Sequence, residues 1–107
     1  MPHAYLKSLE RLPATIQEAV RFIVAELKPE SVILFGSRAR GNHRPTSDVD
    51  LALRGLGQPE KWSSVVLSLD EDPFSLFKID LLNYEEMNDT YRKNVDAEGV
   101  VLYGRTP

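Results

Sequence analysis

The fold is decided by residues 31–53, which read SVILFGSRARGNHRPTSDVDLAL. The stretch opens with a continuous apolar run over 31–35, which is typical of a strand buried on both faces. Gly36 and Gly41 then enclose a short basic segment. The alternating pattern at 48–53 predicts a second strand. Two strands joined by a glycine-bounded basic turn therefore form the centre of the expected fold.

Helices and further strands alternate on both sides of this centre. The other expected elements are a helix from about Leu12 to Pro29, a helix opened by Pro59, a third strand at 76–82, a last helix carrying Met87, Tyr91 and Val95, and a short final strand at 100–103. Trp62 and Tyr91 are expected at core positions of their helices. The alternation predicts an α/β layer fold, with one domain spanning 1–107.

Composition excludes several classes of protein. The chain has 107 residues, a net charge of −3 and a pI of about 5.3, which argues against a general binder of nucleic acid or anionic membranes. It contains no cysteine, which excludes a disulfide scaffold, a thiolate zinc site and a cysteine nucleophile. No apolar run approaches the ~20 residues needed to span a bilayer. We expect a cytoplasmic protein with one modest core.

Three aspartates are candidates for one acidic site. Asp48 and Asp50 point to the same face of their strand because strand side chains alternate. Asp80 lies in the third strand, and it joins them if the two strands are neighbours. Two like charges ~4 Å apart repel by roughly 1–4 kcal/mol. Either some of these carboxylates stay protonated or a divalent cation lies among them, and oxygen-only ligands suit Mg²⁺ or Mn²⁺. The simpler alternative for Asp80 is a surface ion pair with Lys78 or a nearby arginine.

The basic turn supports a phosphate-bearing substrate. Residues 31–47 contain three arginines and no acid, a local charge of +3 in a chain of net −3. Gly36 lets the backbone approach a phosphate closely, and Ser37 can donate its hydroxyl. The Gly-Lys-Ser/Thr ending of a P-loop is absent. Since Mg²⁺ takes few protein carboxylates and completes its shell with substrate phosphates, a nucleotide-like substrate is expected.

Here the sequence resembles a known family. The motif at 36–41, GSRARG, followed by SDVDL at 47–51, is similar to the signature of the minimal nucleotidyltransferases in the DNA polymerase β-like superfamily. The resemblance implies a small mixed sheet with helices packed on one face. It also implies that Asp48 and Asp50 bind two Mg²⁺ ions, with Asp80 as the third carboxylate. The implied nucleotide-binding residues are Gly36, Ser37, Arg38, Arg40 and Ser47. Ser47 is equally well explained as a turn residue.

The same resemblance implies a reaction and a partner. Many minimal members are paired with a helical HEPN-type toxin, and some transfer AMP from ATP to a tyrosine of that toxin, thereby acting as antitoxins. The alternatives are a non-catalytic antitoxin that neutralises its partner by surface contact, and a transferase for a small molecule. Direct nucleic-acid binding is not expected. The base, the acceptor, the stoichiometry of a complex and the roles of His43 and Arg44 stay open, with a plain loop position the simplest account of both residues.

Overall fold

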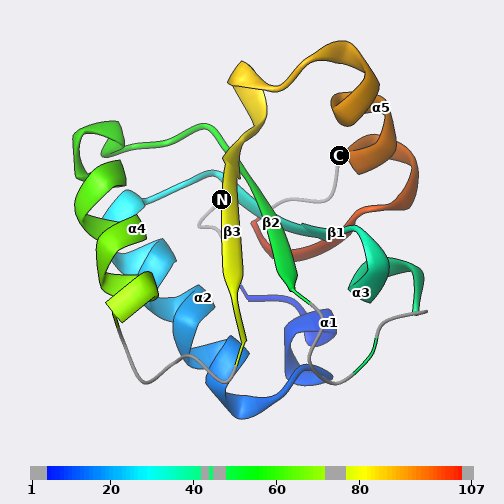
Figure 1. The fold of residues 1–107 in the computed structure, drawn as a ribbon, viewed down its shortest axis with the longest axis horizontal. Helices are drawn as coiled ribbons and strands as arrows, with labels where there is room; N and C mark the ends of the chain where they lie inside the picture. Colours follow the sequence, from blue (N-terminus) through cyan, green and yellow to red (C-terminus); the bar gives the residue numbers. More distant parts are fainter. Residues whose placement is uncertain (1–4, 42–43, 45–47, 72–76, 105–107) are drawn as a thin grey trace.

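Within the residues that the structure describes, a four-stranded sheet forms the centre of the fold (Figure 1). The structure is a computed structural model and describes residues 5–41, 44, 48–71 and 77–104. In chain order the elements are α1 (Lys7–Glu10), α2 (Ala14–Leu27), β1 (Ser31–Phe35), α3 (Ser37–Arg40), β2 (Val49–Arg54), the 3-10 turn η1 (Pro59–Lys61), α4 (Trp62–Glu71), β3 (Ile79–Asn83), the 3-10 turn η2 (Tyr84–Glu86), α5 (Asp89–Glu98) and β4 (Val100–Gly104).

The sheet is mixed, with strand order β3-β2-β1-β4. β1 pairs antiparallel with both β2 and β4, whereas β2 and β3 run parallel. A parallel pair needs a long crossover, and the segment containing η1 and α4 supplies it. The second and third strands are therefore neighbours, which is the condition under which Asp80 was expected to join the other aspartates, and the edge position expected for the last strand is confirmed.

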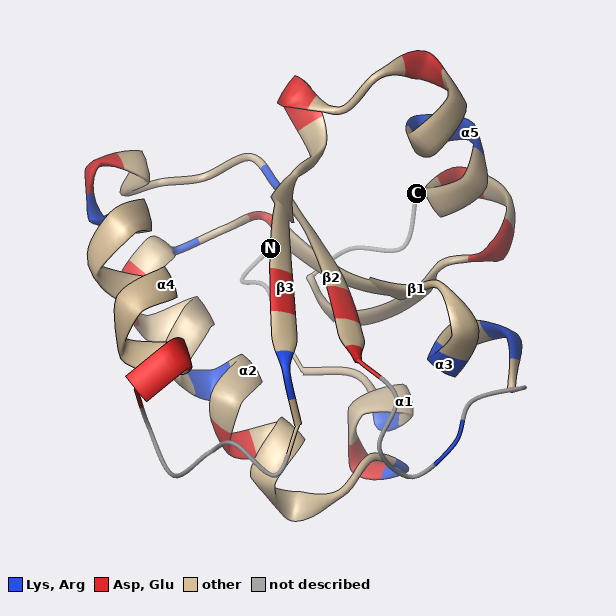
Figure 2. Ribbon diagram, in the orientation of Figure 1, with Lys and Arg blue, Asp and Glu red and all other residues tan. Residues whose placement is uncertain are grey.

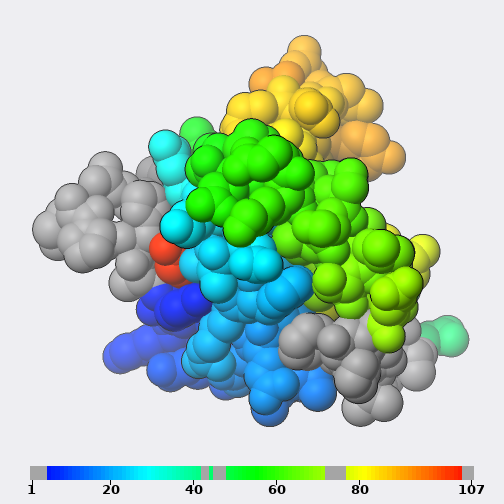
Figure 3. All heavy atoms as spheres, turned by 90° about the vertical axis from the view of Figure 1, so that its left-hand side faces the viewer, coloured from blue at the N-terminus to red at the C-terminus, as the bar shows by residue number. Residues whose placement is uncertain are grey.

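One face of the sheet is covered by α2 and α4. The buried residues of α2 recur at helical spacing and are Ile16, Ala19, Val20, Ile23 and Leu27. They share one core with Val49, Leu51 and Leu53, which β2 turns toward the helices. Figure 3 views the molecule from the α4 side and shows these two helices forming that layer, with the orange residues of η2 and α5 at the top. The apolar side chains of β2 thus face the helices, as predicted.

The opposite face receives partial cover from α5 and the residues before it. Met87 and Val95 are buried against Ile33 and Phe35 of β1 in a second, smaller core. All five residues of β1 are buried, so this strand needs apolar cover on both faces. The predicted mixed sheet with a helical layer is confirmed, and α5 adds a second, incomplete layer beside β1.

Two details of the sequence prediction change. The third strand begins at Ile79, where its first pairing with Val49 forms, and its predicted start at Leu76 lies outside the described residues. Tyr91 was expected in the core, and this prediction was wrong because its side chain is 55% exposed. No helix in the described ranges has both the length and the apolar character that a membrane crossing requires.

Candidate active site

Two of the predicted carboxylates lie side by side on the open part of the sheet. Asp50 of β2 and Asp80 of β3 are register partners in the parallel pair. Partner residues of neighbouring strands project to the same face, so both carboxylates lie on the face away from α2 and α4. Asp48 directly precedes β2 and is exposed. Figure 2 shows the resulting acidic patch as adjacent red bands on β2 and β3, with a third at the start of β2.

The electrostatics of this patch centre on Asp50. Partial burial raises the pKa of the Asp50 carboxyl, and the negative charges of Asp80 and Asp48 raise it further. The positive charges of Arg40 and Lys78 oppose this effect. The Asp50 carboxylate is therefore repelled by both Asp80 and Asp48, so the two neighbouring charges act on one position of the patch.

The ion pair weighed as a simpler role for Asp80 is present. Lys78 Nζ lies 3.9 Å from Asp80 Oδ1, and both side chains are largely exposed. Exposed pairs of this kind contribute ~0–1 kcal/mol. Because that energy is small, the lysine is readily displaced by a stronger ligand, and the pair leaves Asp80 available on the patch.

Gly36 shapes the space beside Asp50. Its φ of 76° lies in the region that favours glycine. A Cβ atom added here would lie 2.5 Å from Asp50 Oδ2, closer than any carbon can stay. The chain leaves β1 through this residue and enters α3 at Ser37, which is half-buried. The absence of a side chain at position 36 thus brings backbone against the carboxylate.

The two arginines of the motif have different surroundings. Arg38 is only 9% exposed, and its guanidinium lies 4.8 Å from the centre of the Phe77 ring, just before β3. Arg40 is exposed, and its Nη1 lies 3.2 Å from Glu98 Oε2 of α5. Arg40 also acts on the Asp50 carboxylate. Arg40 is therefore the more accessible of the two cations, whereas Arg38 joins α3 to the segment that leads into β3.

The remaining predicted loop residues are only partly described. Ser47 and His43 lie outside the described residues. Arg44 is exposed and has an interaction partner.

The donor chemistry of the patch fits a magnesium site. Among the residues described, no group of three carboxylate, imidazole or thiol side chains is arranged to hold a metal ion. Mg²⁺, however, usually takes only one or two protein carboxylates and fills its octahedron with waters and substrate phosphates. The adjacent carboxylates of Asp50 and Asp80, with Asp48 nearby, meet this requirement. Their mutual repulsion is the interaction that a divalent cation would reverse.

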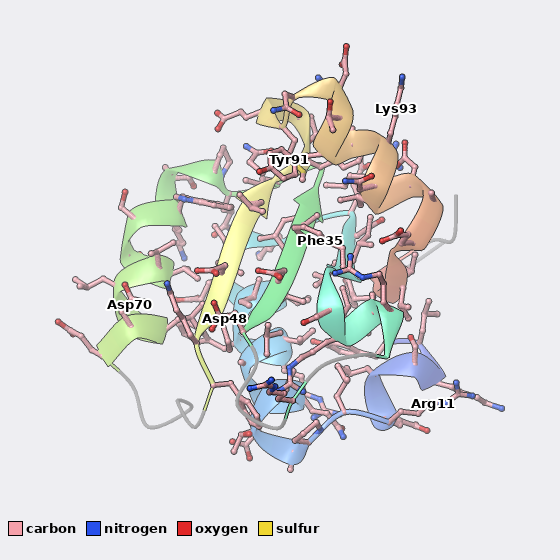
Figure 4. The ribbon with its side chains drawn as sticks, turned by 45° about the vertical axis from the view of Figure 1, so that its right-hand side comes forward. Arg11, Phe35, Asp48, Asp70, Tyr91 and Lys93 are labelled. Atoms are coloured by element: carbon pink, nitrogen blue, oxygen red, sulfur yellow. The ribbon has the colours of Figure 1, made fainter. Side chains whose placement is uncertain are left out.

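A hollow opens beside Asp50 that the sequence did not indicate. It has a volume of about 720 Å³, and its lining includes Phe35, Asp50, Trp62, Leu82, Met87 and Tyr91. Among the residues labelled in Figure 4, Phe35 lies between Asp48 and Tyr91. Helical spacing identified Tyr91 as a core residue, because spacing does not reveal where a helix extends past the sheet that it covers. Met87 is buried, but it lies just before α5 and not in the last helix as predicted.

Comparison with known proteins agrees with this geometry. A family model described as "Polymerase beta, Nucleotidyltransferase" matches residues 17–107. No curated protein matches the chain.

Several solved structures share the fold. One is described as "Crystal structure of the toxin-antitoxin with AMP-PNP"; it is 22% identical, has a TM-score of 0.62, and the match covers 86% of this chain and 73% of that chain. A variant of the toxin-antitoxin MntA-HpeT is also 22% identical, with a TM-score of 0.62 and coverage of 90% and 76%. The toxin-antitoxin MntA-HepT is 20% identical, with a TM-score of 0.50 and coverage of 94% and 74%. At these identities the likeness shows a common fold.

Proposed function

The chain belongs to the polymerase β nucleotidyltransferase family, and we propose that it transfers AMP from Mg²⁺-bound ATP to a hydroxyl group of a partner protein. The observation that carries the proposal is the pairing of Asp50 with Asp80 on the open face, with Asp50 directly beside Gly36 and under the influence of the Asp48 charge. A transferase of this kind needs carboxylates that can hold magnesium next to backbone that can approach phosphates.

The reaction forms one bond and breaks one bond. The acceptor oxygen attacks the α-phosphorus of ATP, and the bond from that phosphorus to the bridging oxygen of the β-phosphate breaks, releasing pyrophosphate. Magnesium bound to these carboxylates would supply electrostatic stabilisation of the negative charge that develops in this in-line displacement. Asp48 and Asp50 are the proposed ligands, and Asp80 receives the proton of the acceptor hydroxyl. Gly36 and Ser37 hold the triphosphate.

Arg40 and Arg38 have different roles in the proposed reaction. Arg40 is exposed and acts on Asp50, so it is well placed to stabilise the charge that develops on the leaving pyrophosphate. Arg38 is buried against Phe77, so it contributes its charge from within the protein. Ser47 stays a candidate ligand of the nucleotide on the strength of the family resemblance.

The proposed acceptor is a tyrosine of a HEPN-type toxin, and the chain then acts as an antitoxin. Two observations support this choice. Solved structures that share the fold belong to toxin-antitoxin assemblies, and one of them carries AMP-PNP, an ATP analogue. In addition, the acidic patch lies on the edge strand β3 and its neighbour, where a second protein can approach it.

The test is the intact mass of the partner after incubation with this protein, ATP and Mg²⁺. We expect a gain of one AMP residue on a tyrosine. Asp48→Asn and Asp50→Asn should each lower the rate about 100-fold or more, because each removes a metal ligand. The chain offers a matched control in Asp70→Asn, an exposed aspartate at the end of α4, labelled in Figure 4, that begins a second Asp-x-Asp sequence. This variant should transfer normally.

Two results contradict the proposal. Full activity of the Asp50→Asn variant would remove the assigned metal site. Neutralisation of the partner by the Asp48/Asp50 double variant, with no mass gain for wild type, would instead identify a non-catalytic antitoxin that acts by surface contact.

A further inference from the structure

The hollow beside Asp50 has no role in the mechanism above, and we propose that it binds the nucleoside half of the nucleotide, with the Tyr91 ring stacking on the base. This inference rests on the proposed function, because it places the rest of the same substrate. The hollow measures about 720 Å³, within the range of small-molecule sites, ~300–1,000 Å³.

The position of the hollow matches the connectivity of a nucleotide. Of the three aspartates of the acidic patch, Asp50 is the one that also lines the hollow. A nucleoside is attached directly to the α-phosphate, so it must begin next to the carboxylates that hold that phosphate. The β- and γ-phosphates extend toward Gly36 and Ser37 on the β1 side of Asp50. The hollow opens from Asp50 and Phe35 toward Leu82 and Tyr91, and it gives the nucleoside a space that begins at the carboxylate.

The lining combines apolar and aromatic side chains with the polar side chains of Asn83, Glu86 and Asn88, a mixture typical of small-molecule sites. Among the described residues, the large apolar side chains that are exposed include Leu82 at 38% and Tyr91 at 55%, and both line this hollow. Phe35 and Met87 form its deeper, buried part. An exposed aromatic ring beside apolar walls binds planar bases by stacking, largely regardless of which base is offered.

Tyr91 is free to act in this way because α5 is held by other residues. Val95, one helical turn later, is 2% exposed and provides the contact with the sheet. The Asn88 side chain accepts a hydrogen bond from the Tyr91 backbone N–H and caps the helix. Neither interaction uses the Tyr91 ring.

An aromatic side chain of the acceptor is the competing occupant, and the structure favours the nucleoside. Asp80, which the proposed reaction places beside the acceptor, does not belong to the described lining of the hollow, whereas Asp50 does. The acceptor is therefore expected to approach along β3, outside the hollow.

The test compares the binding of ATP with that of tripolyphosphate, which has the phosphates and lacks the nucleoside. Calorimetry in the presence of Mg²⁺ should show that Tyr91→Ala weakens ATP binding about tenfold, as expected for loss of one stacking contact. Tripolyphosphate binding should be unchanged, and Tyr91→Phe should bind ATP like wild type. Lys93→Ala, which alters an exposed residue two positions along α5 (Figure 4), is the matched control. ATP, but not tripolyphosphate, should alter the emission of Trp62, the only tryptophan of the chain, which lines the same hollow.

Three outcomes overturn the inference. Unchanged ATP affinity in Tyr91→Ala, together with slower transfer to the partner, would assign the hollow to the acceptor. An equal loss of ATP and tripolyphosphate affinity would assign Tyr91 a general structural role. Unchanged Trp62 emission at saturating ATP would place the nucleoside elsewhere. If wild type binds ATP and the Asp50→Asn variant loses transfer, the proposed function stands whatever Tyr91 does, so the two failures can be told apart.

Discussion

Asp50 lies partly buried on β2, and the carboxylates of Asp48 and Asp80 lie beside it. Burial and these two negative charges raise its pKa above the value in an unfolded chain. The folded protein therefore holds the Asp50 proton more tightly than the unfolded chain does. At pH values above the raised pKa, the ionised Asp50 carboxylate lowers the free energy of unfolding by the full free energy that corresponds to the pKa shift. At pH values below the pKa of aspartate in the unfolded chain, Asp50 is protonated in both states and has no such effect.

The first prediction concerns this carboxylate and pH. Without nucleotide, Asp50→Asn should raise the free energy of unfolding at neutral pH by up to about 1 kcal/mol, since it removes a partly buried charge and its repulsion from Asp80 and Asp48. The advantage should shrink as the pH falls from the raised pKa of Asp50 toward the usual aspartate value, because wild type becomes neutral there too. Urea unfolding of both proteins at a series of pH values measures this. A less stable variant at neutral pH would show that Asp50 is not under repulsion.

The second prediction concerns Gly36. Gly36→Ala should cost about 1–3 kcal/mol, because φ is positive and the new Cβ would meet Asp50 Oδ2 at 2.5 Å. Gly41→Ala is the matched variant, since φ is 80° there and, among the described residues outside its chain neighbours, no atom lies within 4 Å of the added Cβ. It should cost about 1 kcal/mol, from its backbone alone.

Urea unfolding of both alanine variants, alone and with Asp50→Ala, isolates the contact. The additional cost at position 36 should fall when Asp50 is truncated, whereas the cost at position 41 should not change. Equal behaviour at the two positions would mean that the contact between Gly36 and Asp50 carries no energy.

At the scale of elements, α3 and the segment before β3 are joined by the Arg38 guanidinium on the Phe77 ring, at 4.8 Å. This contact connects the turn after β1 with the strand that carries Asp80. The third prediction is that Phe77→Leu, which keeps an apolar side chain but removes the ring, lowers stability by about 0.5–2 kcal/mol. Arg40→Ala, which removes an exposed pair with Glu98 and a longer-range attraction to Asp50, should cost no more than about 1 kcal/mol.

Thermal unfolding of the two variants checks this ranking. A larger loss for Arg40→Ala than for Phe77→Leu would contradict the assignment of Arg38 as the contact that holds α3 to β3.

The elements also show what the sequence could predict. Strand alternation placed Asp48 and Asp50 on one face, because a period of two is a local property of the backbone. That Asp80 lies beside Asp50 depends on the pairing of β2 with β3, which alternation does not predict. Arg38 shows the opposite case, because its partner Phe77 follows 39 residues later, at a distance that only tertiary structure closes. Tyr91 has the helical spacing of a core residue, but α5 packs through Val95 and Tyr91 extends beyond the cover of the sheet. Local patterns therefore predicted the elements and the acidic face, whereas contacts between elements decided how the arginine and the tyrosine are used.

At the scale of the whole molecule, binding at the acidic patch is linked to global stability. A ligand that binds only the folded state stabilises it by RT ln(1 + [L]/Kd), about 2.7 kcal/mol at a ligand concentration of 100 Kd. In a domain of 107 residues this corresponds to a rise of roughly 10 °C in Tm. The fourth prediction is that a non-hydrolysable ATP analogue produces such a rise only together with Mg²⁺, and that EDTA abolishes it.

Thermal unfolding with the analogue alone, with Mg²⁺ alone and with both separates the contributions. The Asp48/Asp50 double variant should show no rise in any of the three, whereas Asp70→Asn should behave as wild type. A full rise in the presence of EDTA would mean that the nucleotide binds without the metal.

The crowding of three negative groups on β2 and β3 has a practical consequence for engineering. A laboratory selection for heat resistance, carried out without substrate, would enrich amide or alanine replacements at Asp50, because they remove a charge that is partly buried and repelled by its neighbours. The selected variants would be more stable and, under the proposed function, catalytically inactive. A stabilised enzyme should therefore be selected with magnesium and a nucleotide analogue present throughout. Under the proposed function, the carboxylates that destabilise the ligand-free protein would then stabilise the folded state through the bound cation.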